Sequence, residues 1–246
     1  MKYIIILCFL LLAVPVHAAM VGVNIAEKID GNMKTMINAE NNVMKTTVDL
    51  QNTGSITYNS RARLDIFDGE RIIFTGWSKE NVVKPGSFKD YPLFWIKNDG
   101  NLSARLRVYY GEEIKEKMIE IPQLDDITSE DVFEISNVRT YDDRITLFIR
   151  SKENVDNMII IPNNYPLSWI VEQNDVGRIN ANEFKQVTIG YSTPEYSQIN
   201  INLITVSEDG RYQSAHEVLL QRESGISFYV NPFFDWVSIS FRSVFG

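Results

Sequence analysis

The chain has 246 residues, of which 44% are hydrophobic and 23% charged, and its formal net charge is −8. This apolar content excludes an intrinsically disordered chain, and the lack of an apolar run near the roughly 20 residues that span a bilayer excludes a polytopic membrane protein. One Cys and two His exclude most nucleophilic and metal-site chemistry, so the residues do not disclose a specific activity.

The N-terminus is typical of a secretory signal peptide. Lys2 precedes an apolar stretch, Ile4 to Val14, and Pro15 leads to a small-residue pattern that ends at Ala18. We expect cleavage after Ala18, and hence an exported protein at the cell surface, in the periplasm or outside the cell. An uncleaved anchor is the alternative, but an apolar run of about 14 residues is too short to span a bilayer.

Loss of residues 1–18 would remove Lys2, Cys8 and His17. The remaining 228 residues would hold no Cys, one His, and 23 basic against 32 acidic residues. The resulting charge of −9 disfavours nucleic-acid binding as a property of the whole surface. A chain without disulfides must be held together by core packing, which two sandwiches of about 100 residues each can provide.

Short alternating segments separated by Asp-Gly pairs predict an all-β protein. Asp-Gly is the strongest short signal for a tight hairpin because both residues tolerate positive φ. It occurs at 30–31, 68–69, 99–100 and 209–210. Apolar and polar residues alternate between these turns, for example in 61–66, 104–109 and 145–149. No helical period of ordinary length occurs between residues 20 and 224, so we expect antiparallel sheets rather than a parallel α/β sheet.

The predicted strands fall into two halves. About seven lie between residues 20 and 121, beginning with Val21–Ile29, and this is the strand count of an immunoglobulin-like sandwich. A second set, which includes Met158–Ile161, lies in 132–224. The acidic segment 122–131 is expected to link the halves. We predict two tandem immunoglobulin-like antiparallel β-sandwiches, with a short amphipathic helix in the tail 225–246.

Two turns of the first half carry a family resemblance. Asn52-Thr53-Gly54-Ser55 closes one strand, and Lys84-Pro85-Gly86-Ser87 opens another that ends at Trp95. With the strand Leu102–Tyr110 after the next Asp-Gly turn, this order resembles the cell-adhesion-related immunoglobulin-like modules of bacterial and archaeal surface proteins, the CARDB type. The resemblance implies a use like that of fibronectin type III domains, as spacers and interaction surfaces without catalytic residues. The second half has a looser pattern that lacks the Pro-Gly pair.

Catalytic and metal-binding patterns are scarce. His216, the one imidazole outside the signal segment, falls in a predicted strand, and we interpret it as an ordinary strand residue. There is no phosphate-loop motif and no zinc ligand set, and turn formation explains Asp142-Asp143 better than calcium does. We therefore expect no enzyme, cofactor or metal. A carboxylate-based exported hydrolase is the least favoured alternative, because nothing in the sequence places two acids across a cleft.

The first candidate binding residues are four arginines, Arg61, Arg63, Arg105 and Arg107. All lie on the polar side of their strands, and these strands are neighbours if they are the third and sixth of an immunoglobulin-like domain. Such a patch would suit an anionic ligand, for example an envelope polysaccharide. The alternative, which we favour, is charge pairing with Asp65 and with Glu113 or Glu116, because like charges side by side need compensation.

The second candidate is the tail. Asn231-Pro232 can cap and start a helix, and apolar residues at helical spacing then give an amphipathic segment of about 14 residues. Its contact residues would be Phe233, Phe234, Trp236, Phe241 and Phe245. Packing on a sandwich or docking on a partner is favoured over peripheral membrane contact, because Arg242 is the one cation on the polar side of the helix.

Asn101 begins a glycosylation sequon, Asn101-Leu102-Ser103, that matters only if the host glycosylates exported proteins. Together these features predict an exported, non-enzymatic surface or envelope interaction module that binds a protein or an envelope polysaccharide, with the tail as its attachment element. A periplasmic protein similar to pilus-assembly chaperones is the alternative, suggested by the signal segment, two domains and length alone. The sequence identifies neither the ligand nor the oligomeric state, nor whether the domains are rigidly joined.

Overall fold

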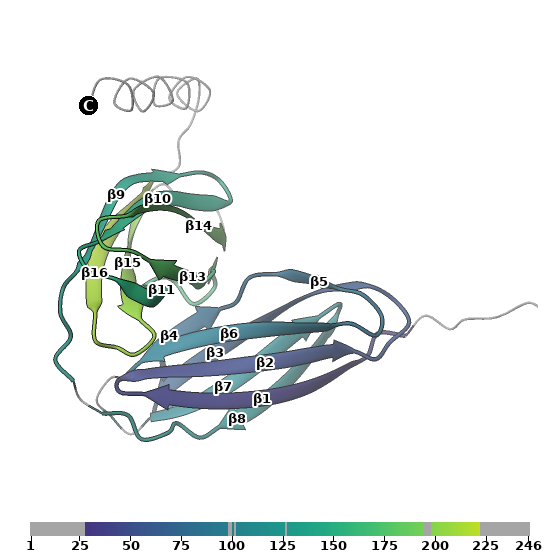
Figure 1. Ribbon diagram of the computed structural model, residues 1–246. Coiled ribbons are helices and arrows are strands. Elements are labelled where there is room, and N and C mark those ends of the chain that lie inside the picture. Colours follow the sequence, from purple (N-terminus) through teal and green to yellow (C-terminus); the bar gives the residue numbers. More distant parts are fainter. Residues whose placement is uncertain (1–27, 98–99, 101, 126, 194–197, 222–246) are drawn as a thin grey trace, which may run out of the picture.

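The computed structural model describes residues 28–97, 100, 102–125, 127–193 and 198–221. Within these ranges all regular structure is β-strand, in two sandwiches whose long directions form an L (Figure 1). None of the described residues forms a helix that could span a membrane. The predicted signal segment, Asn101 and the tail 225–246 with its aromatic contact residues lie outside the described residues.

The first sandwich packs a three-stranded sheet on a five-stranded one. The orders are β1-β2-β6 and β4-β3-β7-β8, with β5 beside β3, and all pairs are antiparallel. The strands are β1 (Gly31–Glu40), β2 (Val43–Asn52), β3 (Tyr58–Asp68), β4 (Arg71–Trp77), β5 (Asn81–Val83), β6 (Phe88–Ile96), β7 (Leu102–Tyr110) and β8 (Glu113–Ile119).

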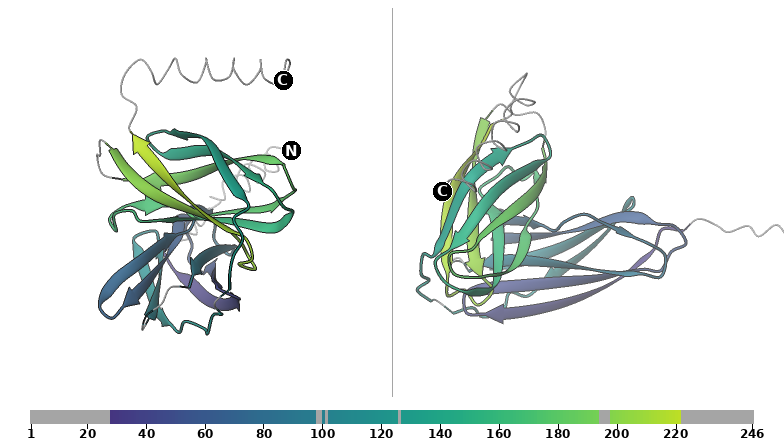
Figure 2. Two further views of the ribbon diagram at one scale, coloured as in Figure 1. Left: turned by 90° about the vertical axis from the view of Figure 1, so that its left-hand side faces the viewer. Right: turned by 45° about the horizontal axis from the view of Figure 1, so that its top comes forward.

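The second sandwich stands across one end of the first (Figure 2) and consists of two four-stranded sheets, β12-β14-β10-β9 and β13-β11-β15-β16. Its strands are β9 (Phe133–Thr140), β10 (Arg144–Ser151), β11 (Val155–Asn163), β12 (Ile170–Val171), β13 (Asn174–Ile179), β14 (Phe184–Ser192), β15 (Gln198–Ser207) and β16 (Gln213–Gln221). Without the short β5 and β12, both halves have one topology, in which the first, second and fifth strands form one sheet and the other four the second. The prediction of two immunoglobulin-like sandwiches is confirmed.

The alternation that predicted the strands places their apolar residues in the core. Leu64 lies opposite Leu106, and Ala62 opposite Val108, and all four are fully buried between the sheets. Because side chains alternate across a strand, the polar residues between them lie on the outer side of the five-stranded sheet. The same alternation places the four arginines on the outer side of this sheet.

The beginning of the first sandwich differs from the prediction. Gly31 does not turn a hairpin but begins β1, and the hairpin to β2 turns instead at Asn41, whose φ is 51°. Residues 28–29, the described end of the predicted strand Val21–Ile29, lie outside any strand. The Asp-Gly prediction is correct at Gly69 and Gly210, which turn the β3–β4 and β15–β16 hairpins with φ of 61° and 71°.

The two motifs behind the family resemblance meet at Asn52, which is fully buried. Its side-chain amide donates to the carbonyl of Val83 at 2.9 Å, and its side-chain oxygen accepts from the Gly54 N–H at 2.9 Å. Its backbone N–H donates to Ser87 at 3.0 Å, and its carbonyl accepts from Gly86 at 2.8 Å. Asn52 therefore ties the turn after β2 to the segment before β6.

Candidate functional site: the arginine face and the domain junction

The four arginines lie together on the outer side of the five-stranded sheet. β3 and β7 are neighbours, with Arg63 opposite Arg107. We call this surface the arginine face; its residues are Arg61, Arg63, Asp65, Arg105, Arg107 and Glu116. The arginine side chains are only 12 to 26% exposed, because acidic and aromatic side chains lie against them.

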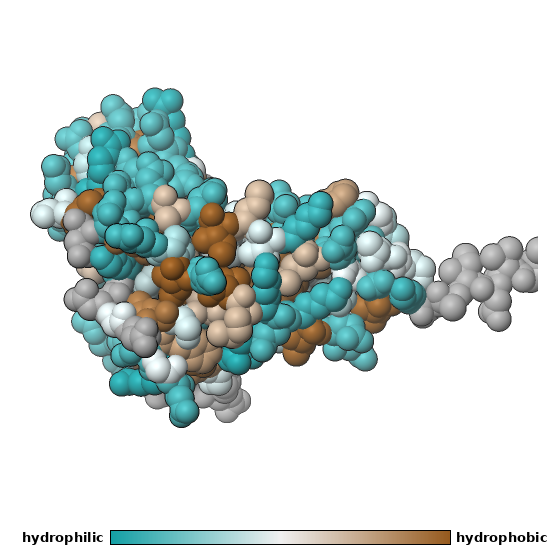
Figure 3. Space-filling view, turned by 90° about the horizontal axis from the view of Figure 1, so that it is seen from below, coloured by the Kyte–Doolittle hydropathy of each residue, from teal (hydrophilic) through white to brown (hydrophobic). Residues whose placement is uncertain are grey.

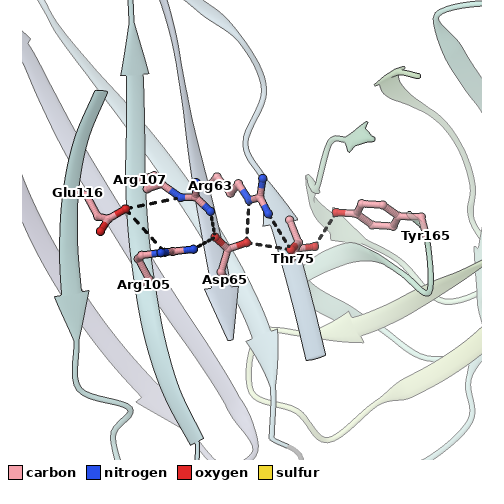
Figure 4. A network of polar contacts seen from close by, with 7 residues as sticks. All are labelled: Arg63, Asp65, Thr75, Arg105, Arg107, Glu116 and Tyr165. Carbon is pink, nitrogen blue, oxygen red and sulfur yellow. Dashed lines mark hydrogen bonds and ion pairs between the residues drawn. The ribbon is translucent and has the colours of Figure 1, made fainter. Parts of the chain in front are cut away.

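Asp65 is at the centre of the arginine face, and its side chain is fully buried. Arg63 Nε donates to Oδ1 at 2.7 Å, Arg107 Nη2 donates to Oδ2 at 2.5 Å, and the Thr75 hydroxyl donates to Oδ1 at 2.8 Å (Figure 4). Arg105 Nη2 is 3.6 Å from Oδ2. Burial alone would raise the pKa of Asp65, but the hydrogen bonds from Arg107 and Arg63 outweigh it and hold that pKa below its usual value. Asp65 is therefore ionised and anchors three arginines.

The outer charges of the face are paired more loosely. Glu116 on β8 is half-exposed, and its Oε2 is 3.7 Å from Arg105 Nε and 4.0 Å from Arg107 Nε. Arg61 forms a separate pair with Glu80 at 2.7 Å. The other three arginines are thus arranged in charge pairs with Asp65 and Glu116 rather than as an open basic patch.

Aromatic rings lie beside the guanidinium groups. The guanidinium carbon of Arg63 is 5.1 Å from the ring centre of Trp77, and that of Arg105 is 4.9 Å from the ring centre of Phe67. Trp77 in turn packs on Tyr109, with ring centres 5.4 Å apart. A cation over an aromatic face is favourable by roughly 0.5–2 kcal/mol. Side chains of the protein itself thus cover the face in part.

The second sandwich closes two sheet edges of the first through Gln173. The Gln173 side-chain amide donates to the Phe94 carbonyl and accepts from the Phe94 N–H, both at 2.7 Å. The Gln173 backbone N–H donates to the Trp77 carbonyl at 2.8 Å. β6 and β4 end their sheets, so Phe94 and Trp77 would otherwise present unpaired backbone groups.

The cores of the two sandwiches meet across β11. The predicted strand Met158–Ile161 lies within β11, and all four of its side chains are buried. Ile159 and Ile161 pack in the core of the first sandwich, whereas Met158 and Ile160 pack in that of the second. Since successive side chains of a strand point to opposite sides, β11 is a wall shared by both cores.

Polar contacts complete the junction. The Asn41 side chain donates to the Asp209 carbonyl at 2.6 Å, so a hairpin turn of each sandwich meets the other. Glu208 accepts from Lys45 of the first sandwich at 2.6 Å and from Asn157 at 2.5 Å. Burial would raise the pKa of Glu208, but these hydrogen bonds lower it below its usual value.

Tyr165 connects the junction to the arginine face. Its hydroxyl donates to the backbone carbonyl of Thr75 at 2.5 Å, and the Thr75 hydroxyl holds Asp65 (Figure 4). Burial raises the pKa of Tyr165, so its hydroxyl stays protonated and remains a donor. The second sandwich therefore contacts β4, whose Thr75 hydroxyl bonds to the buried aspartate of the neighbouring β3.

Two pockets among the described residues are lined by carboxylates. Asp49 and Asp90 are opposite residues of β2 and β6, and burial together with the charge of Asp90 raises the pKa of Asp49. Asp90 lines a junction pocket of about 230 Å³ together with Asp175, but Asp49 does not. In a second pocket the pKa values of Glu208 and Asp209 are lowered, the opposite of what a general acid needs.

Among the residues that the structure describes, no three His, Cys, Asp or Glu side chains are grouped to hold a metal ion. His216 lies within β16, as predicted, on the same side of the strand as the buried Val218. Sequence reasoning did not find Gln173. A glutamine between short strands carries no signal, and its role depends on a partner 79 positions away.

A scan against models of known protein families gives no match, and a comparison with curated protein sequences finds no relative. Solved structures match at low similarity. The transglutaminase of red sea bream has a TM-score of 0.30 at 7% identity, over 81% of this chain and 32% of that one. Native alpha-2-macroglobulin of E. coli has a TM-score of 0.27 at 8% identity, over 79% and 17%. The chain thus spans less than a third of the length of either protein, and a likeness at this level carries no statement about activity or partners.

Proposed function

We propose that the protein is exported and acts, without catalysis of its own, as a two-domain spacer and interaction module at the cell surface, in the periplasm or outside the cell. The domain junction supports this proposal. Domains joined only by a linker move independently, whereas a shared core wall and the Gln173 contacts hold these two at one angle. A fixed angle suits a protein that presents a surface in a defined direction.

The CARDB type is the proposed membership of the first domain. Its support is the set of hydrogen bonds at Asn52, which join the two motifs that carry the resemblance. The fold itself hosts many functions, so the membership implies a spacer or adhesion role only through those motifs.

Fractionation of cells that make the full chain tests export. We expect a mature protein that lacks residues 1–18, recovered outside the cytoplasm, and cross-linking is expected to capture a protein or an envelope polysaccharide. An unprocessed chain retained in the cytoplasm would overturn the proposal. Deletion of residues 231–246 tests the tail separately, because unchanged fractionation of the shortened protein removes the tail as its attachment element.

The chaperone-like alternative requires a strand edge that can be lent to a subunit, and β8 is poorly suited to that. β8 ends its sheet, but Lys115 and Lys117 lie on its inner side, opposite Val108 and Leu106. Inward-pointing charges on an end strand discourage the pairing of a further strand. Co-purification of a stoichiometric, aggregation-prone subunit would nevertheless favour this alternative.

A further inference from the structure

The arginine face holds more positive charge and more donors than its own acceptors use. Arg63, Arg105 and Arg107 face two carboxylates, Asp65 and Glu116. Arg105 has ion pairs at 3.6 and 3.7 Å but no hydrogen bond to either acid, and the buried Nε atoms of Arg105 and Arg107 lack hydrogen-bond partners. Each guanidinium has five N–H donors, so the face can accept one more carboxylate.

Glu116 marks the place where that carboxylate would bind. Its distances of 3.7 and 4.0 Å to the two Nε atoms are too long for hydrogen bonds, and its side chain is 50% exposed. Asp65, by contrast, is fully buried and bound at 2.5 to 2.8 Å. Asp65 is therefore fixed, whereas Glu116 is an anion that a stronger ligand can displace.

The neighbours of Glu116 indicate a protein segment as the ligand. Ile114 and Met118 lie on the same side of β8 as Glu116 and are 57% and 59% exposed. Seen from below, the surface of the molecule shows apolar residues among hydrophilic ones (Figure 3). Arginine, methionine and aromatic residues together are typical of protein interfaces, and a polysaccharide has no apolar side chains to cover Ile114 and Met118.

We propose that the arginine face and the adjoining β8 bind an acidic protein segment. A carboxylate of the segment takes the place of Glu116 on Arg105 and Arg107, and apolar neighbours of that carboxylate cover Ile114 and Met118. The inference rests on the proposed function as an interaction module and gives the chemistry of its partner.

Binding of a fluorescent peptide of alternating Leu and Glu to the purified full chain, followed by fluorescence anisotropy at low salt, tests the proposal. Glu116→Gln is expected to tighten binding several-fold because it removes the competing carboxylate, and Arg105→Gln to weaken it about tenfold. Arg105 makes no hydrogen bond to Asp65, so its variant should fold, and a thermal melt checks this. The control is Arg150→Gln on the second sandwich, an arginine with its own acidic partner, Glu134, which should leave binding unchanged.

Weaker binding by Glu116→Gln, or unchanged binding by a folded Arg105→Gln variant, overturns the proposal. Equal binding of a peptide of alternating Leu and Lys overturns it as well. If polygalacturonate binds with the same dependence on Arg105 and Glu116 while the acidic peptide does not, the ligand is a polysaccharide and the protein segment is excluded. Each of these failures leaves the export test unaffected, so the two proposals fail separately.

Discussion

The side-chain amide of Gln173 bonds to both backbone groups of Phe94, at 2.7 Å each, and both residues are buried. One side chain of the second sandwich thus does on the edge of β6 what a neighbouring strand does inside a sheet. The contact requires an amide, because the same group must donate to a carbonyl and accept from an N–H.

Replacing Gln173 with Leu keeps the size of the side chain and removes both hydrogen bonds. Each buried backbone group left unsatisfied costs roughly 1–3 kcal/mol, so we expect the free energy of unfolding to fall by about 2–4 kcal/mol. Urea denaturation measures this loss. Gln186→Leu, at an exposed position of β14, is the control and should change stability by less than about 0.5 kcal/mol. Equal effects of the two changes would contradict the role of Gln173.

Gly76 is required by the same contact. A Cβ atom at this position would lie 2.5 Å from Gln173 Nε2, so Gly76→Ala should displace the amide and cost about 1–3 kcal/mol. In a Gln173→Ala background the obstructing amide is absent and most of this cost should disappear. A double-mutant cycle by urea denaturation measures the coupling. Additive losses would show that Gly76 is required for another reason.

Acid should weaken the protein through Asp65 and Glu208. The pKa of each is below its usual value in the folded state, for Asp65 because hydrogen bonds from Arg107 and Arg63 outweigh burial, and for Glu208 because those from Lys45 and Asn157 do. The stabilisation of the folded state by these two ionised carboxylates is therefore complete above their unfolded-state pKa values of about 4. It is lost as the pH falls through their lower folded-state pKa values. Unfolding free energies at pH 7 and pH 3 should show a smaller difference for Glu208→Gln than for the wild type. An unchanged difference would exclude Glu208 as a source of the acid sensitivity.

Asn52 should be among the residues on which the stability of the first sandwich depends most. Asn52→Ala removes a buried amide that donates to Val83 and accepts from Gly54, and it leaves their backbone groups unsatisfied. We expect a loss of about 3 kcal/mol, seen as a lower Tm in calorimetry. Asn32→Ala, at an exposed position of β1, should leave the Tm nearly unchanged.

Removing one acid of the Asp49 and Asp90 pair should have the opposite effect. These side chains are opposite one another on β2 and β6, and like charges in that position destabilise a sheet. Asp90→Asn is expected to raise the free energy of unfolding at pH 7 by roughly 0.2–1 kcal/mol. The gain should shrink at low pH, where a protonated Asp49 no longer repels its neighbour. A destabilised variant at pH 7 would show that the pair has another partner.

The strands that alternate clearly could be predicted from the sequence. Arg61 to Ile66 contain alternate apolar residues, and β3 forms there with its apolar side chains in the core. β1 was missed because Met33, Thr35 and Ile37 are only half-buried and their alternation is weak, while Asp30-Gly31 gave a turn signal in front of them. The local sequence pattern predicts a strand correctly where one side of that strand is fully buried. It does not predict an end strand whose inner side is only half-buried.

The arginine face was predicted better than the junction. Parity along β3 and β7 together with the pairing of these strands is enough to place the arginines beside Asp65. The junction depends on contacts between halves that no spacing encodes, such as Gln173 with Phe94. One signal was present: the unbroken apolar run Met158–Ile161 is typical of a strand buried on both sides.

The shared wall has a consequence for the order of folding. The first half of the chain leaves the ribosome first, yet Ile159, Gln173 and Val206, which complete its core and edges, are made later. Until the chain has grown past Val206, the nascent first sandwich exposes open strand edges and apolar side chains, the surfaces through which unfinished chains associate. The two halves must therefore complete their folding together. A chain truncated between them would need other factors to prevent its association with other chains.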